Sequence, residues 1–92
     1  TLIAAPGRDI LQCEQGNPGM GTGGMGDVLT GSISAIAAQG VRHHLNLWEA
    51  SCVAVQLHAS AADSLAQKGT GPIGLTPSET ILEMRTLLNK LL

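Results

Sequence analysis

Glycine dominates one short stretch of this chain and limits what that stretch can become. Seven of the 12 glycines lie between Gly16 and Gly31, in the run GNPGMGTGGMGDVLTG. Glycine loses more conformational freedom on folding than any other residue, so a run of this kind is unfavourable inside a regular helix or strand. It is typical of a loop that approaches a ligand closely, and one acidic residue, Asp27, follows directly after Gly26.

We expect two strands before this loop and one helix directly after it. Residues 1–5 and 9–14 read as strands joined by a tight turn at Pro6 and Gly7. Residues 27–40 carry apolar side chains at helical spacing and end at Gly40, a natural residue for the position after a helix.

Two further helices have clear start signals. Asn46 and Glu49 have the spacing of a capping box, and Thr76, Pro77 and Glu79 supply a cap, a first-turn proline and an acid for the last helix. The first of these helices carries an alanine-rich apolar stripe, which predicts a close neighbour: Ala50, Val53, Ala54, Leu57, His58, Ala61, Ala62 and Leu65. The last helix carries Ile81, Leu82, Met84, Leu87, Leu88 and Leu91.

Composition restricts the size of the core and the class of partner. With 92 residues, no Phe or Tyr and one Trp, the chain has a marginal core of small aliphatic side chains, and we expect it to be part of something larger. Five scattered basic residues argue against nucleic-acid binding, and no apolar run approaches a membrane span. Cys13 and Cys52 lack metal or disulfide spacing, which favours a reduced, cytoplasmic setting.

The glycine run fits phosphate binding better than dinucleotide or P-loop templates. Two overlapping GxGxxG matches are a weak signal, and no Lys-Ser or Lys-Thr follows the last glycine. The backbone N–H groups of Gly23, Gly24 and Gly26 at a helix start are suited to phosphate. Asp27 beside them is either a base that activates a hydroxyl or an acid that caps or stabilises the first helical turn.

The same residues carry a resemblance to a known family. GTGGMGDVLTG resembles the GxGD motif of the ribokinase-like superfamily. GNPGMGTGGMGDVLTGSISAIAAQG, together with EASCVAVQLHASAAD, is similar to the C-terminal part of the NAD(P)H-hydrate dehydratase family. The resemblance implies an α/β, ribokinase-like three-layer fold, of which residues 1–92 are a C-terminal portion with about two strands and three helices.

The resemblance also implies a reaction and its residues. Such enzymes use ADP or ATP to phosphorylate the hydroxyl of hydrated NADH or NADPH, and loss of phosphate regenerates the coenzyme. Asp27 is then the catalytic base that contacts the hydrate, Gly26 touches the nucleotide, and Gly23 and Gly24 complete the anion hole. GNPGM is similar to bacterial members, which favours ADP; Mg²⁺ is expected with ligands outside this chain, and homo-oligomers, often tetramers, are expected. The isolated chain should be inactive.

Two other functions fit the same motif. One is a vitamin or sugar kinase of the same superfamily, and the other is a non-catalytic nucleotide-binding or assembly module in which Asp27 only caps a helix. Asn17 is expected to shape the entry turn, with a contact to substrate or nucleotide as the alternative. His58 is expected in the core with its ring hydrogen-bonded, and Met20 and Met25 are expected in packing. Asp63 and Glu83 are expected on solvated helix faces.

Overall fold

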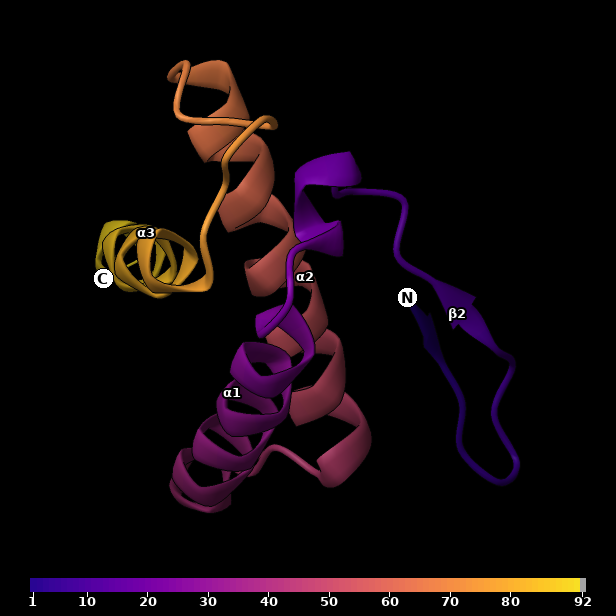
Figure 1. Ribbon diagram of the computed structural model, residues 1–92. Coiled ribbons are helices and arrows are strands. Elements are labelled where there is room, and N and C mark those ends of the chain that lie inside the picture. The colour runs from indigo at the N-terminus through magenta and orange to yellow at the C-terminus, as the bar shows by residue number, and fades with distance from the viewer. Residues whose placement is uncertain (92) are drawn as a thin grey trace.

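A computed structural model describes residues 1–91 and contains two short strands, two 3-10 turns and three α-helices (Figure 1). The strands are β1 (Leu2–Ile3) and β2 (Leu11–Gln12), and the helices are α1 (Met25–Gly40), α2 (Leu47–Gln67) and α3 (Pro77–Lys90). The 3-10 turns are η1 (Pro18–Gly21) and η2 (Val41–His43). The expected count and order of strands and helices are confirmed.

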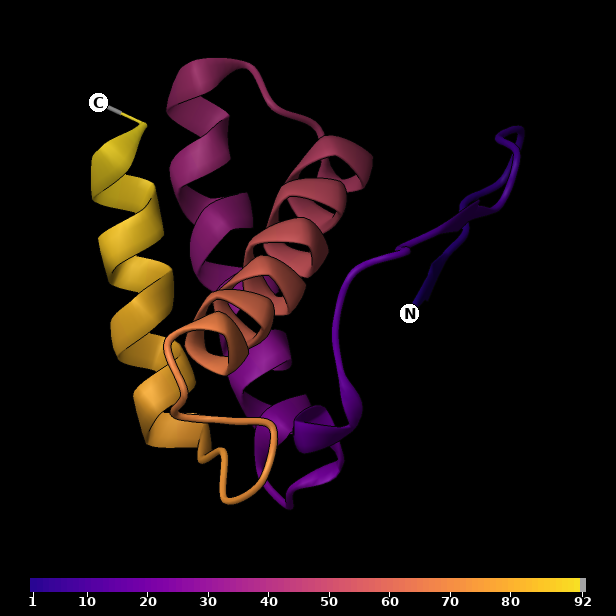
Figure 2. The same ribbon diagram turned by 90° about the horizontal axis from the view of Figure 1, so that it is seen from above.

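The strands form an antiparallel hairpin that projects away from the helices (Figure 2). Leu2 pairs with Gln12 and Ile3 with Leu11, so each strand is shorter than the sequence predicted. The turn is where it was expected: Gly7 has φ +74°, a backbone conformation that favours glycine, and Arg8 N–H donates to the Ala5 carbonyl.

Helix α2 is the centre of the packing and contacts both α1 and α3. Five of its six alanines are almost fully buried, which lets the neighbouring helices approach closely. One apolar cluster joins Met25, Ala62, Leu65 and Leu75, with Met20 packed against it. The other joins Leu57, Ala61 and Met84, with Val28, Ile36 and Leu87 against it. Val53, which the apolar stripe of α2 places inward, is instead exposed. Ile81, Leu82, Leu88 and Leu91, from the last part of the chain, are exposed as well.

The helix starts follow the local signals, whereas one helix end does not. The Asn46 side chain accepts from Glu49 N–H, the Glu49 carboxylate accepts from Asn46 N–H, and Thr76 caps α3. Gly40, however, lies within α1 as its last residue, in the right-handed helical conformation. The chain continues through η2, and His44 after η2 takes the left-handed conformation, with φ +60°. A Cβ at Gly40 would lie 3.0 Å from the Leu45 Cβ, so this position favours a residue without a side chain.

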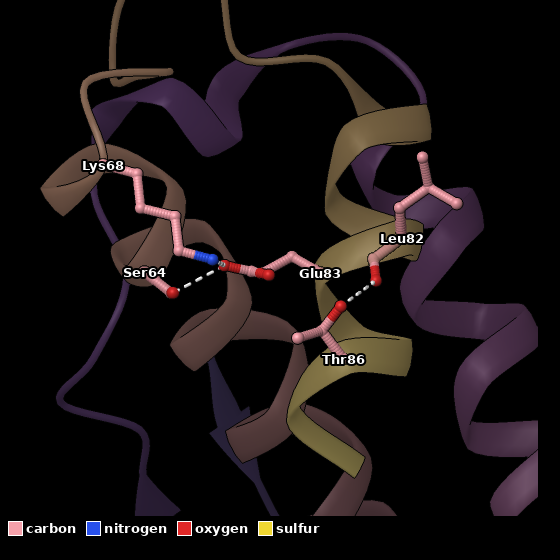
Figure 3. A network of polar contacts seen from close by, with 5 residues as sticks. All are labelled: Ser64, Lys68, Leu82, Glu83 and Thr86. Carbon is pink, nitrogen blue, oxygen red and sulfur yellow. Dashed lines mark hydrogen bonds and ion pairs between the residues drawn. The ribbon is translucent and has the colours of Figure 1, made fainter. Parts of the chain in front are cut away.

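A buried carboxylate ties the end of α2 to α3 (Figure 3). Glu83 is 5% exposed, accepts from the Ser64 hydroxyl at 2.6 Å and pairs with Lys68 Nζ at 2.5 Å. Its interaction with Lys68, more than any other contact, lowers the pKa of Glu83. The expectation that Glu83 faces solvent is therefore wrong, because its partners come from another helix.

Within residues 1–91, no helix has both the length and the apolar character that crossing a membrane requires.

Candidate functional site

The glycine-rich loop runs from Gly16 to the first turn of α1, and its first part is a capped 3-10 turn. Asn17 stands before η1, and its Oδ1 accepts from Gly19 N–H at 3.0 Å. Thr22 follows η1, and its hydroxyl lies 3.0 Å from the carbonyl oxygens of both Gly19 and Leu75, so it can donate to either. Asn17 thus shapes the entry of the loop, as expected, and a direct contact with substrate or nucleotide stays a prediction.

The fold itself explains the lack of a side chain at three glycines of the loop, through close packing or, at Gly16 (φ +115°) and Gly24, also through a positive φ. A Cβ on Gly16 would lie 3.0 Å from Met20 Sδ, and one on Gly19 would lie 2.6 Å from the Pro72 carbonyl oxygen. Gly24 has φ +98°, and a Cβ there would lie 3.0 Å from Pro77 Cγ. The absence of a side chain at Gly24 is therefore explained by the fold, without any ligand.

The other three glycines have no such internal reason. A Cβ on Gly21, Gly23 or Gly26 would meet no atom within 4 Å. These positions face open space, so their lack of a side chain keeps the surface of the loop bare. That is the surface an anion would need in order to reach the backbone.

Backbone donors are free along the same stretch. In the part of the chain that the structure describes, no hydrogen bond uses the N–H groups of Gly23, Gly24, Gly26 or Asp27. The first donors of an α-helix have no partner within the helix, and the helix dipole adds partial positive charge there. Met25 N–H donates back to Thr22, and Val28 N–H makes the first regular helical bond, to Gly24. The loop can therefore bind an anion through its main chain.

Asp27 lies in the first turn of α1, third after the cap residue Gly24, and is exposed. Its carboxylate makes no hydrogen bond to any residue within 1–91. The interpretation that Asp27 caps the helix is wrong in its literal form, because Gly24 holds that position. Asp27 can still stabilise the first turn through a favourable interaction with the helix dipole. It can also act as a base, since its carboxylate is accessible and directly follows the free N–H groups of the loop.

Asp63 on α2 holds the start of the loop, a contact that the sequence did not reveal. Its Oδ2 accepts from Gly16 N–H and its Oδ1 accepts from Asn17 Nδ2, both at 2.9 Å. The expectation that Asp63 lies on a solvated face is thus wrong, because the loop covers it. Ala59, one turn earlier on the same helix face, also lies close to Gly16, so the start of the loop runs along this face of α2.

His58 occupies the core, as expected from its place on the apolar stripe. It is 5% exposed, and its Nε2 has no hydrogen-bond partner within residues 1–91. Burial lowers the pKa of His58, and a hydrogen bond with the Met25 backbone opposes this more weakly. The expected hydrogen bonding is therefore incomplete.

Across residues 1–91, no three His, Cys, Asp or Glu side chains come together as a possible metal site.

Two apolar grooves lie along the helices, apart from the glycine loop. One, of about 460 Å³, runs between α1, α2 and α3 past Ile36, Val53 and Leu88. The other, of about 530 Å³, lies between α2 and α3 past Cys52 and Leu87. Neither groove includes Asp27 or the loop glycines, and Asp27 is exposed at the surface of this chain.

Comparisons with known proteins agree on one family. The family model described as NAD(P)H-hydrate dehydratase matches residues 1–84. A bifunctional NAD(P)H-hydrate repair enzyme Nnr of Vibrio cholerae is 49% identical over 83 residues, covering 90% of this chain and 16% of the relative. The enzyme of the same name in Coxiella burnetii is 40% identical over 89 residues, which cover 97% of this chain and 17% of that relative.

A third relative carries a more specific name. The ADP-dependent (S)-NAD(P)H-hydrate dehydratase of Neisseria meningitidis is 38% identical over 91 residues, covering 99% of this chain and 29% of the relative. The chain therefore spans 16 to 29% of the length of these three curated relatives. No solved structure gives a significant match to this chain.

Proposed function

The chain belongs to the NAD(P)H-hydrate dehydratase family, and from this premise we propose that it is part of an enzyme that converts hydrated NADH or NADPH back to the coenzyme. ADP transfers its terminal phosphoryl group to the hydroxyl of the hydrate and becomes AMP. Phosphate then leaves with its oxygen, a ring proton is lost, and the carbon–carbon double bond is restored. One observation carries the proposal: an exposed carboxylate directly follows a run of free N–H groups on an unobstructed loop.

Each residue of the site has a distinct role in this proposal. Asp27 takes the proton from the hydrate hydroxyl as that oxygen attacks the terminal phosphorus of ADP. The N–H groups of Gly23, Gly24 and Gly26 donate to the phosphoryl oxygens and stabilise the charge that accumulates there. The bare surface at Gly23 and Gly26 lets the phosphate approach the main chain.

The rest of the proposal concerns the complete protein. We propose that the hairpin and helices belong to a ribokinase-like three-layer α/β domain, and that the protein works in the cytoplasm as a homo-oligomer, with a tetramer as the form to test. In this proposal Mg²⁺ accompanies the phosphates of ADP, with its ligands outside this chain, as the family resemblance implies. None of the roles given to this chain depends on that ion.

Replacing the base tests the reaction directly. In the complete protein, Asp27→Asn keeps the size of the side chain but removes its ability to accept a proton. We expect kcat to fall by at least about 100-fold while the Kd for ADP changes by less than about threefold. Turnover is measured from NADH absorbance after addition of ADP and NADH hydrate, and nucleotide binding by calorimetry.

Asp9→Asn is the matched control, because Asp9 is an exposed acid on the hairpin, outside the loop. Unchanged turnover in Asp27→Asn would show that Asp27 is not the base. A wild-type complete protein that binds ADP but converts no hydrate would instead favour the nucleotide-binding module.

A further inference from the structure

The glycine loop contacts the rest of the chain at its start, at its centre and at its end. At its start, Gly16 N–H and Asn17 Nδ2 donate to Asp63 on α2. At its centre, the Thr22 hydroxyl reaches the Leu75 carbonyl oxygen. At its end, Gly24 packs against Pro77, the first residue of α3.

Only the first of these points depends on an ionisable side chain. The Asp63 carboxylate uses one oxygen for the main chain and the other for a side-chain amide, both at 2.9 Å. Hydrogen bonds to a charged acceptor are about twice as strong as neutral ones. The other two points rest on a hydroxyl and on van der Waals contact, so Asp63 makes the strongest of the three.

A series of hydrogen bonds continues from Asp63 to the first turn of α1. Asn17 donates to Asp63 through Nδ2 and accepts from Gly19 N–H through Oδ1. The Gly19 carbonyl accepts from Thr22 N–H, and the Thr22 carbonyl accepts from Met25 N–H. A continuous series of hydrogen bonds thus links Asp63 on α2 to Met25, the residue before Gly26.

From this geometry we propose that Asp63 is a positioning residue for phosphoryl transfer, acting through Asn17 on the anion-binding N–H groups and on Asp27. The inference rests on the proposed function. Asp63 touches neither ADP nor the hydrate in this role. It holds the loop so that donors and base meet the reacting groups in line, and a displacement of about 1 Å in such a site can cost about 100-fold in rate.

An exchange of the two side chains tests the proposal in the complete protein. Asp63→Asn alone places two amides against each other, and Asn17→Asp alone places two carboxylates together. The double variant combines Asn17→Asp with Asp63→Asn. In it, the amide at position 63 accepts from Gly16 N–H and donates to the carboxylate at position 17. That carboxylate still accepts from Gly19 N–H, so the series of bonds is restored with the charge on the other partner.

We expect each single variant to lose about 10- to 100-fold in kcat, while its KM for ADP changes less than about threefold. The kcat of the double variant should recover to within about fivefold of wild type. Glu83→Gln is the matched control, because Glu83 also ties α2 to another segment but on the α3 side. It should lower the denaturation midpoint without changing kcat.

Backbone hydrogen exchange provides a measure that does not need activity. In Asp63→Asn, the amides of residues 16–24 should exchange faster than in wild type, while those of α3 stay unchanged. Failure of the double variant to recover, unaltered exchange in the loop, or a loss of kcat equal to that of Glu83→Gln would each overturn the inference. An inactive wild type would refute the proposed reaction, and the exchange measurement would still decide whether Asp63 holds the loop.

Discussion

Gly26 is the loop residue at which a ligand requirement and a folding requirement can be separated. A Cβ there meets no atom within 4 Å, and the residue lies in the first turn of α1. Gly26→Ala should therefore keep or raise the free energy of unfolding, by up to about 1 kcal/mol, because alanine favours helix. The added methyl group should hinder an incoming phosphate, and we expect the Kd for ADP to rise at least about tenfold, about 1.4 kcal/mol.

The control for this prediction is Gly31→Ala, on the same helix. Gly31 also faces open space, but it lies beyond the first turn. It should stabilise the helix without weakening ADP binding, with affinity measured by calorimetry and stability by urea denaturation. Equal ADP affinity in the two variants would mean that phosphate does not approach along the surface at Gly26.

Sequence reasoning at the residue scale succeeded where the cause is local and failed where it is distant. The loop, its acid and the packing of Met20 and Met25 could be read from the chain. Asp63 and Glu83 could not, because a charged residue on a helix is solvated by default and becomes partnered only when another segment covers it. The partners of Asp63 lie 46 and 47 residues away, at a distance that no local pattern encodes.

At the scale of elements, the pair of α2 and α3 should carry a pH dependence through Glu83. The interaction with Lys68 lowers the folded-state pKa of Glu83 below its ordinary value of 4.5. The unfolded chain then binds the proton more readily, so this contribution to stability is present above about pH 4.5 and is lost as pH falls through the folded pKa. At pH 7 the free energy of unfolding of wild type should exceed that of Glu83→Gln by about 1 to 2 kcal/mol. Solvent screening keeps the difference this small, because the Lys68 side chain is 53% exposed.

Urea denaturation at pH 7, 5 and 3.5 checks this expectation. The difference between wild type and Glu83→Gln should persist from pH 7 to 5 and shrink toward pH 3.5. Glu14→Gln, at an exposed position on the β2 side of the hairpin, should match wild type at every pH. A difference that grows as pH falls would show that the charged form of Glu83 is not the stabilising one.

The boundaries of elements follow the same division between local and distant causes. Both helix caps with a side-chain signature, at Asn46 and Thr76, were predictable because capping is decided within four residues. Helix α1 begins earlier than expected, at Met25, because Gly24 serves as its cap through a backbone conformation that leaves no side-chain signature. Gly40 was misread because its role is close contact with Leu45.

For the molecule as a whole, the number and order of elements were predictable, but their arrangement was not. Hydrophobic spacing identifies a helix, yet it does not say which face meets which neighbour. Val53 and Ile81 have the spacing of buried residues and are 41% and 51% exposed. They line the groove between the helices, together with Ile36 and Leu88. A helical face of this kind fits the proposal that the helices belong to a larger layered domain, in which apolar faces require a covering layer.

The hairpin offers a direct test of that proposal. Each strand is two residues long, Leu2 is 67% exposed and Leu11 46%, and a two-stranded hairpin is marginal in water. A contact of Arg8 over the Trp48 ring, 5.2 Å from its centroid, contributes on the order of 0.5 to 1 kcal/mol. In the 92-residue chain alone, the amides of Ile3 and Cys13 should therefore exchange with solvent far faster than those of Ala61 and Ala62.

In the complete protein, the same strands should lie within a continuous sheet, because unpaired strand edges are stabilised by neighbouring strands. We expect the exchange of the Ile3 and Cys13 amides to slow by at least about 100-fold relative to the chain alone, while that of the α2 core changes much less. Mass-spectrometric exchange on both proteins under one set of conditions makes the comparison. Equal exchange of the hairpin in the two proteins would contradict the three-layer fold, since the strands would then have gained no partner.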